Sequence, residues 1–334
     1  MALTFYQQDL IKAVLEGNRE MARKRTYEIL NKALETKQDG AFAKHMLDKY
    51  PDANDKEIKV PYNLSNLLTV AYPSDADYPF NINRYFLSER ESAVAGTIEK
   101  MYHASQQLKE RKIKYSNTVL LDGKSGTGKT EFGKYIAYRL GLPFVYLNFT
   151  NVIDSLLGKT GQNIDLVFSF VQKYPCVFMI DEIDSIGEMR SSRSSSSEKE
   201  NGRIVTTLFL CLDKLSNDNI VIGATNRKDI LDSALISRFR IQHTVETLRQ
   251  KEREQLVAMY LRDTGFMTVK NEETLAREIS EFAAEPREPR ILESQLIQRM
   301  ADSLLANKPI RLVDEKEPQH KKTLLDAVAS GFCG

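Results

Sequence analysis

The pattern GKSGTGKT constrains the fold of this chain more than any other feature. It matches GxxxxGK[ST] at every fixed position. The apolar run TVLLD precedes it and the helical pattern EFGKYIAYRL follows it. Glycines let successive backbone N–H groups curl around phosphates, and a helix N-terminus adds partial positive charge. The pattern therefore predicts a strand, a phosphate-binding loop and a helix, with a loop made of Gly123, Lys124, Ser125, Gly126, Thr127, Gly128, Lys129 and Thr130.

A pair of carboxylates follows a second apolar run. Residues 176–180 read CVFMI and end in Asp181 and Glu182. Ligands of open α/β sheets bind at the carboxyl ends of the strands, so both acids are predicted to lie beside the phosphates of ATP. There Lys129 reaches the β- and γ-phosphates, and Thr130 and Asp181 hold Mg²⁺. Glu182 polarises the attacking water.

Short apolar strands alternate with helical patterns through the centre of the chain. Fully apolar strands separated by helices are typical of a parallel sheet that helices cover on both faces. The predicted fold class is therefore α/β, with a P-loop NTPase parallel sheet. The predicted strands are Thr118–Leu121, Phe144–Asn148, Cys176–Ile180 and Ile220–Ala224, and the predicted helices are Glu89–Lys112, Thr130–Leu140, Asn163–Lys173 and Gly202–Leu215.

The segments on either side of this core differ from it in pattern. Apolar residues recur at three-to-four spacing from about Leu3 to Asp48, which predicts helices. Prolines at 51, 61, 73 and 79 then predict an extended linker with one short helix over Leu64–Val70. Beyond Leu248 three helices are predicted, over Gln250–Asp263, Glu272–Ala284 and Ile291–Ala306. We divide the chain into a helical N-terminal domain (1–50), a linker (51–84), an α/β domain (85–247), a helical lid (248–310) and a tail (311–334).

Composition narrows the functional classes. The chain has 47 basic and 46 acidic residues, so its charge does not favour a dedicated nucleic-acid binder. Its three cysteines are far apart and form no CxxC pair, which argues against a disulfide framework and for a reducing compartment. No signal-peptide pattern and no apolar stretch of membrane-spanning length is present. We therefore expect a soluble, cytoplasmic protein.

Four motifs in order (GKSGTGKT, VFMIDEID, GATNR and LDSALISRF) resemble AAA ATPases in the narrow sense. That group contains microtubule-severing, ESCRT-disassembling and proteasomal ATPases, and the resemblance covers roughly residues 115–300. It implies an AAA+ module with a helical lid, Mg²⁺-dependent ATP hydrolysis and a hexameric ring. It further implies that Asn226 senses the γ-phosphate and that Arg238 is lent to the ATP of a neighbouring subunit. A sensor-2 arginine is implied near the start of the helix Ile291–Ala306, where we favour Arg290 over Arg287.

The chain departs from the pattern of this family at several positions. Many members carry two adjacent arginines at the finger, whereas Ser237 precedes Arg238 here, with Arg240 as a substitute. Leu156 replaces the aromatic residue with which relatives grip a translocating polypeptide. Lys124 and Ser125 replace two prolines of the phosphate loop. The Ser-rich stretch from Glu188 to Asn201 takes the place of a second pore-facing loop, or is a solvated loop.

The leading hypothesis is an oligomeric ATPase that remodels a protein substrate or partner. Alternatives are a nucleic-acid-associated loader or initiator, a non-enzymatic ATP-controlled switch, and a regulatory ATPase that partners a separate protease or defence effector. Salt-dependent DNA affinity would favour the loader, and measurable turnover would exclude the switch. Arg238 could alternatively form a salt bridge within its own chain instead of reaching a neighbouring subunit. The N-terminal helices either bind a partner or serve packing.

Overall fold

The computed structural model describes residues 5–15, 19–34, 36, 39–49, 58–75, 78–154, 160–185, 195–266 and 271–313. The chain divides into two compact units, residues 1–246 and 247–334. The first contains a six-stranded sheet with the order β1-β3-β4-β5-β2-β6. β1 is antiparallel to β3, and the other pairs are parallel. The strands are β1 (Leu68–Ala71), β2 (Asn117–Asp122), β3 (Phe144–Asn148), β4 (Cys176–Asp181), β5 (Asn219–Thr225) and β6 (Ile241–Thr244).

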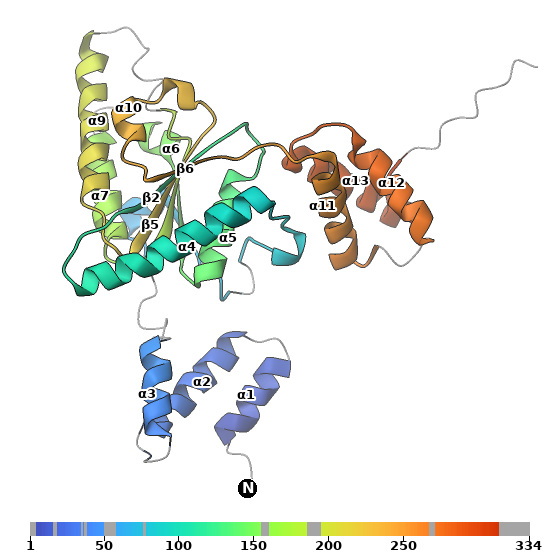
Figure 1. Cartoon of the computed structure of the whole chain (residues 1–334), viewed down its shortest axis with the longest axis horizontal. Helices are drawn as coiled ribbons and strands as arrows, with labels where there is room; N and C mark the ends of the chain where they lie inside the picture. Colours follow the sequence, from blue (N-terminus) through green and yellow to red (C-terminus); the bar gives the residue numbers. More distant parts are fainter. Residues whose placement is uncertain are drawn as a thin grey trace, which may run out of the picture. The chain divides into compact units, whose positions relative to one another are not determined.

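Helices cover both faces of the sheet (Figure 1). Successive residues of a strand point to opposite faces. Leu120 and Phe178 therefore pack on the side of α7 and α9, whereas Leu121 and Met179 pack on the side of α4 and α5. Because both faces are buried, the central strands need apolar residues at every position. The helices of this unit are α4 (Glu89–Glu110), α5 (Lys129–Leu140), α6 (Phe149–Asp154), α7 (Thr160–Val171), α9 (Ser195–Asp213) and α10 (Ser233–Ile236).

The predicted fold class is confirmed, and the four predicted strands are present, each within one residue of its expected bounds. The predicted helix over Leu64–Val70 is wrong. A 3₁₀ turn ends at Leu64, and β1 then pairs with the free edge of β3. Leu68 is buried against the sheet, so tertiary pairing outweighs the local helical spacing. β6 was not predicted, because partly buried and exposed residues alternate along it and none is fully buried.

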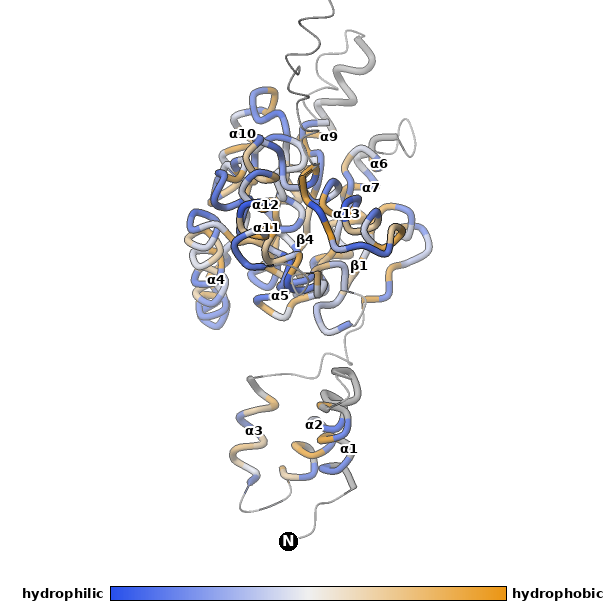
Figure 2. The backbone as a smooth tube through the Cα atoms, turned by 90° about the vertical axis from the view of Figure 1, so that its right-hand side faces the viewer, coloured by the Kyte–Doolittle hydropathy of each residue, from blue (hydrophilic) through white to orange (hydrophobic). Residues whose placement is uncertain are grey.

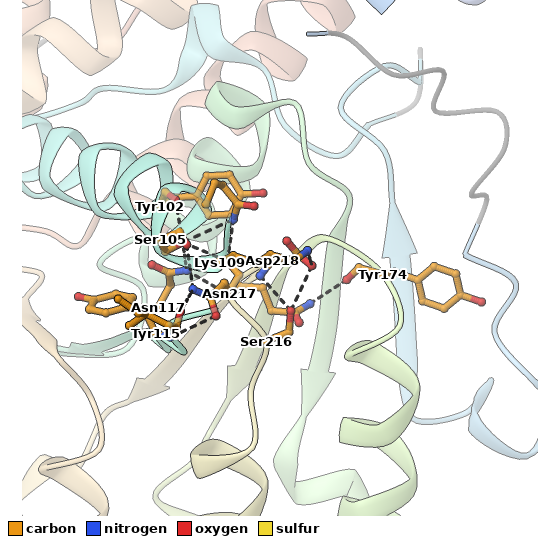
Figure 3. A network of polar contacts seen from close by, with 12 residues as sticks. Tyr102, Ser105, Lys109, Tyr115, Asn117, Tyr174, Ser216, Asn217 and Asp218 are labelled. Atoms are coloured by element: carbon orange, nitrogen blue, oxygen red, sulfur yellow. Dashed lines mark hydrogen bonds and ion pairs between the residues drawn. The ribbon is translucent and has the colours of Figure 1, made fainter. Parts of the chain in front are cut away.

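A buried amide network ties α4 to the edge at which β2 and β5 begin (Figure 3). The side chain of Asn217 donates to the carbonyls of Ser105 (2.8 Å) and Ile113 (3.2 Å), and it accepts from the Tyr115 N–H (3.1 Å). The Asn117 amide donates to the Ser105 hydroxyl (2.9 Å) and to the Asn217 carbonyl (3.0 Å). One asparagine side chain thus satisfies three backbone groups of α4 and the segment that follows it, which lie 102 to 112 residues away in the sequence.

Replacing Asn217 by Ala is expected to destabilise the sheet unit. The change removes three hydrogen bonds and leaves their backbone partners without a donor or acceptor, at a cost of about 1–3 kcal/mol for each buried group. We expect the thermal midpoint, followed by far-UV circular dichroism, to fall by roughly 5 °C or more. Gln298→Ala, which removes an exposed side-chain contact to Asp302, is the control and should leave the midpoint within about 1 °C. An unchanged midpoint for Asn217→Ala would contradict this role.

The other long elements of the described residues are helices. Near the N-terminus lie α1 (Phe5–Leu15), α2 (Arg19–Ala33) and α3 (Gly40–Lys49), and α2 packs against both of the others. Figure 2 shows that α2 and α3 each carry hydrophobic and hydrophilic residues. The second unit holds α11 (Gln250–Asp263), α12 (Glu272–Ala284) and α13 (Pro289–Ala306). None of the helices within the described ranges is long and apolar enough to cross a membrane. The five-part domain division stays a prediction.

Candidate active site

The phosphate loop, residues 123–130, joins the end of β2 to the start of α5 in a conformation that requires glycine. Gly126 and Gly128 have φ angles of 80° and 103°, in the left-handed region that disfavours other residues. A Cβ atom on Gly123 would lie 2.4 Å from the Val245 carbonyl oxygen, closer than any stable contact. Because Gly128 caps α5, the free N–H groups of the first helical turn lie at the loop. This cradle fits a chain of phosphates.

Lys129 is held at three points inside this loop. Its Nζ donates to the carbonyls of Gly123 (2.7 Å) and Lys124 (2.9 Å) and to Oδ1 of Asn226 (2.6 Å). Burial lowers the pKa of Lys129 from its ordinary value of 10.5, and the negative charge of Asp181 opposes that shift. The ammonium is thus already oriented, and it lies beside the polar residue that follows β5.

The carboxylate of Asp181, the last residue of β4, accepts several hydrogen bonds. The Thr130 hydroxyl donates to its Oδ2 at 3.0 Å, and the Tyr146 hydroxyl donates to the same oxygen at 3.2 Å. The Glu182 N–H donates to Oδ1 at 3.0 Å. Burial, followed by the charge of Asp181, raises the pKa of Tyr146, so its hydroxyl keeps its proton. A carboxylate beside a threonine hydroxyl is an oxygen donor set that fits Mg²⁺.

Glu182 adopts an unusual backbone conformation directly after β4. Its φ of 55° is left-handed, which is uncommon for a residue with a side chain and is often found at functional sites. Its Oε2 accepts a hydrogen bond from the Thr150 hydroxyl (3.0 Å), which also lies 2.9 Å from the Ser185 hydroxyl. Thr150 therefore orients the carboxylate that would face an attacking water.

The structure thus brings Lys129, Thr130, Asp181, Glu182 and Asn226 together where the parallel strands end, the carboxyl edge of the sheet. Sequence reasoning missed two residues there, which come from β3 and from the helix that follows it. The strand Phe144–Asn148 was predicted, and parallel neighbours end at one edge. Polar residues at the end of that strand were therefore the clue that could have identified Tyr146 and Thr150.

Arg238 lies at the opposite edge of the same sheet, the amino edge, where the parallel strands begin. Its carbonyl accepts from the hydroxyl of Thr118, near the start of β2, at 2.7 Å. Thr118 precedes Gly123 by five residues along an extended strand, so the two lie roughly 17 Å apart at about 3.3 Å per residue. The carbonyl of Arg238 is thereby fixed at the edge away from the phosphate loop of its own chain.

The guanidinium of Arg238 has local partners. It donates to the Ala234 carbonyl (2.8 Å), forms an ion pair with Asp213 (3.2 Å) and lies 4.1 Å from the centroid of the Phe209 ring. The salt-bridge alternative for this residue is therefore realised in the single chain. The side chain is 27% exposed, so part of it remains accessible.

Two other predicted residues lie in the second unit. Arg290 is exposed in the first turn of α13, and its sensor-2 role stays a prediction. Arg287 bonds to Glu285 and to Gln295 within that unit. The pore-loop candidate at Leu156 falls outside the described residues, as do residues 188–194 of the Ser-rich stretch.

Comparison with known proteins agrees with this geometry. Residues 119–247 match the family model for the ATPase family associated with various cellular activities, AAA. The chain is 32% identical over 159 residues to an uncharacterized AAA family ATPase, y4kL, of Sinorhizobium fredii, a match that covers 48% of each chain. It is 34% identical over 137 residues to the 26S proteasome subunit RPT4 of Saccharomyces cerevisiae, covering 40% of this chain and 31% of that one.

A third relative is the peroxisomal ATPase pex6 of Schizosaccharomyces pombe. It is 38% identical over 160 residues, which cover 46% of this chain and 16% of that one. The matches thus span less than half the length of each of these three relatives. The matched region contains the acidic pair, Asn226 after β5, and Arg238. The fold also has the parallel sheet and the phosphate loop that are typical of ATP-hydrolysing domains. Residues 119–247 of this chain are therefore similar to the AAA family of ATPases.

Proposed function

We propose that this chain hydrolyses ATP with Mg²⁺ at the carboxyl edge of the sheet. The observation that carries the proposal is the convergence of Lys129, Asp181 and Glu182 on the phosphate loop. Thr130 and Asp181 would hold the metal, which when bound neutralises charge on the phosphate oxygens. Lys129 would bind the β- and γ-phosphates through an ammonium that its loop already orients.

The proposed hydrolytic step uses two further groups. Glu182 would accept the proton of the attacking water, with Thr150 holding its carboxylate in place. Asn226 would orient that water and the γ-phosphate through an amide that lies 2.6 Å from Lys129 Nζ. Every group in this scheme comes from the phosphate loop, from the carboxyl ends of β4 and β5, or from α6, the helix that follows β3.

We further propose that the active unit is a homo-oligomer, a hexameric ring, that acts on a protein substrate or partner. Arg238 supports this part, because it lies at the edge away from the phosphate loop of its own chain. An arginine that faces a neighbouring subunit's γ-phosphate stabilises the charge of the transition state there. Arg238 would have to exchange its ion pair with Asp213 for that contact.

We also propose a cytoplasmic location. It is supported by Cys176 and Cys211, which are buried and form no disulfide, as is typical of a reducing compartment.

The oligomer is expected to form when ATP is bound and hydrolysis is blocked. Glu182→Gln should retain nucleotide while the trans arginine closes the interface. Light scattering after size exclusion, with ATP present, should then show a species several times the 38.1 kDa of the single chain. The same protein without nucleotide is the control, with a smaller mass expected. If only the single chain elutes in both conditions, the ring is excluded.

A further inference from the structure

Tyr146 is a polar residue of the site to which the proposed reaction gives no role. Its hydroxyl donates to Asp181 Oδ2 at 3.2 Å, the oxygen that also accepts from Thr130 at 3.0 Å. The Glu182 N–H donates to the other carboxylate oxygen, Oδ1, at 3.0 Å. Three donors from three different segments thus hold one carboxylate.

The sheet positions the phenol for this contact. β3 and β4 are parallel, with Tyr146 opposite Met179 and Asn148 opposite Asp181. Residues two apart on one strand share a face, so Tyr146 and Asp181 are diagonal neighbours on the same face. Such neighbours lie about 7–8 Å apart, a distance that a tyrosine spans and shorter side chains do not. The hydroxyl therefore reaches the carboxylate along the sheet surface.

The ring is fixed as well. Its centroid lies 6.4 Å from that of Phe144, and it packs against the apolar cluster between the sheet and α5. Phe144 is 3% exposed and belongs to that cluster. Because the ring is anchored by packing, its hydroxyl oxygen is held within hydrogen-bond distance of Asp181.

We propose that Tyr146 is a positioning residue for the metal site: it fixes the carboxylate of Asp181 so that the carboxylate and the Thr130 hydroxyl present their oxygens to Mg²⁺ together. Because Thr130 donates a hydrogen bond to Oδ2, the lone pairs of its own oxygen remain available to the metal, and Oδ1, which accepts from the Glu182 N–H, keeps a second lone pair for it. With a second donor on Oδ2 and a third on Oδ1, the carboxylate cannot rotate away from that arrangement. This inference rests on the proposed Mg²⁺-dependent reaction at the same site.

The test is the coupling between Mg²⁺ and nucleotide in the full chain, measured without turnover. A fluorescent ADP is titrated into wild type and Tyr146→Phe, once with Mg²⁺ and once with EDTA. The ratio of the two affinities reports how well the site holds the metal. Loss of one hydrogen bond corresponds to about a 3- to 10-fold change in an equilibrium constant. We expect the ratio to fall by about that factor in Tyr146→Phe, with the affinity in EDTA within about twofold of wild type.

Tyr78→Phe is the matched control, because that hydroxyl donates to the Lys134 carbonyl rather than to a carboxylate of the site. It should leave the affinity ratio unchanged. A wild-type ratio in Tyr146→Phe, with only the melting temperature lowered, would overturn the proposal and make the hydroxyl a packing feature. If wild type itself shows no Mg²⁺ dependence, the proposed metal site fails, which is a different result from a failure of Tyr146 alone.

Discussion

Arg238→Ala is expected to lower the ATPase rate per subunit by roughly 100-fold or more, and mixing it with inactive Glu182→Gln should restore part of the activity. Each variant lacks one half of an interfacial site. A subunit with an intact Glu182 can use the arginine of a Glu182→Gln neighbour. In a head-to-tail assembly formed at a 1:1 ratio, about one quarter of the interfaces pair an intact glutamate with an intact arginine. Phosphate release, measured per subunit over a range of protein concentrations, checks both parts.

Asp213→Ala separates this explanation from the local alternative. It removes the ion pair of Arg238 within the chain but leaves the arginine in place. If Arg238 acts only through that pair, Asp213→Ala should cost as much activity as Arg238→Ala. We expect a much smaller loss, because an exposed ion pair contributes little to stability. A rate that survives Arg238→Ala and does not depend on concentration would mean that each subunit hydrolyses ATP alone.

Lys129→Ala is expected to weaken nucleotide binding by roughly 100-fold or more. Lys129 is 7% exposed, and its ammonium donates to two loop carbonyls and to Asn226. Its removal takes away the cation that faces the phosphates, and hydrogen bonds to charged groups contribute about 1.5–3 kcal/mol each. It also leaves the loop carbonyls without their donor, so the loop loses its shape before any ligand arrives. Equilibrium titration with a fluorescent nucleotide measures the change.

Lys134→Ala is the matched control for this prediction. Lys134 lies on the same helix, and its ammonium pairs with Glu131 rather than with the phosphate loop. The control should bind nucleotide with an affinity within about twofold of wild type, since a surface pair contributes about 0–1 kcal/mol. A Lys129→Ala protein that still bound nucleotide with an affinity close to wild type would remove the basis of the site described above.

Much of the site could be predicted because its chemistry is local in the sequence. The motif GKSGTGKT joins a strand to a helix within one continuous segment, and the acidic pair directly follows an apolar strand. The long central strands were predictable for a related reason, since burial on both faces demands uninterrupted apolar residues. The edge strands were not. Leu68–Ala71 and Ile241–Thr244 are short and only partly buried, so their pairing depends on neighbours that are distant in the sequence.

By itself the sequence determined the phosphate loop, the acidic pair, the central sheet and the AAA resemblance, because each follows from residues within one short segment. Only the tertiary structure decided which side chains from separate segments meet. It placed Tyr146 on Asp181 and Thr150 on Glu182, since parallel strands bring their ends to one edge. It also placed Arg238 at the other edge, through a strand register that no local pattern encodes.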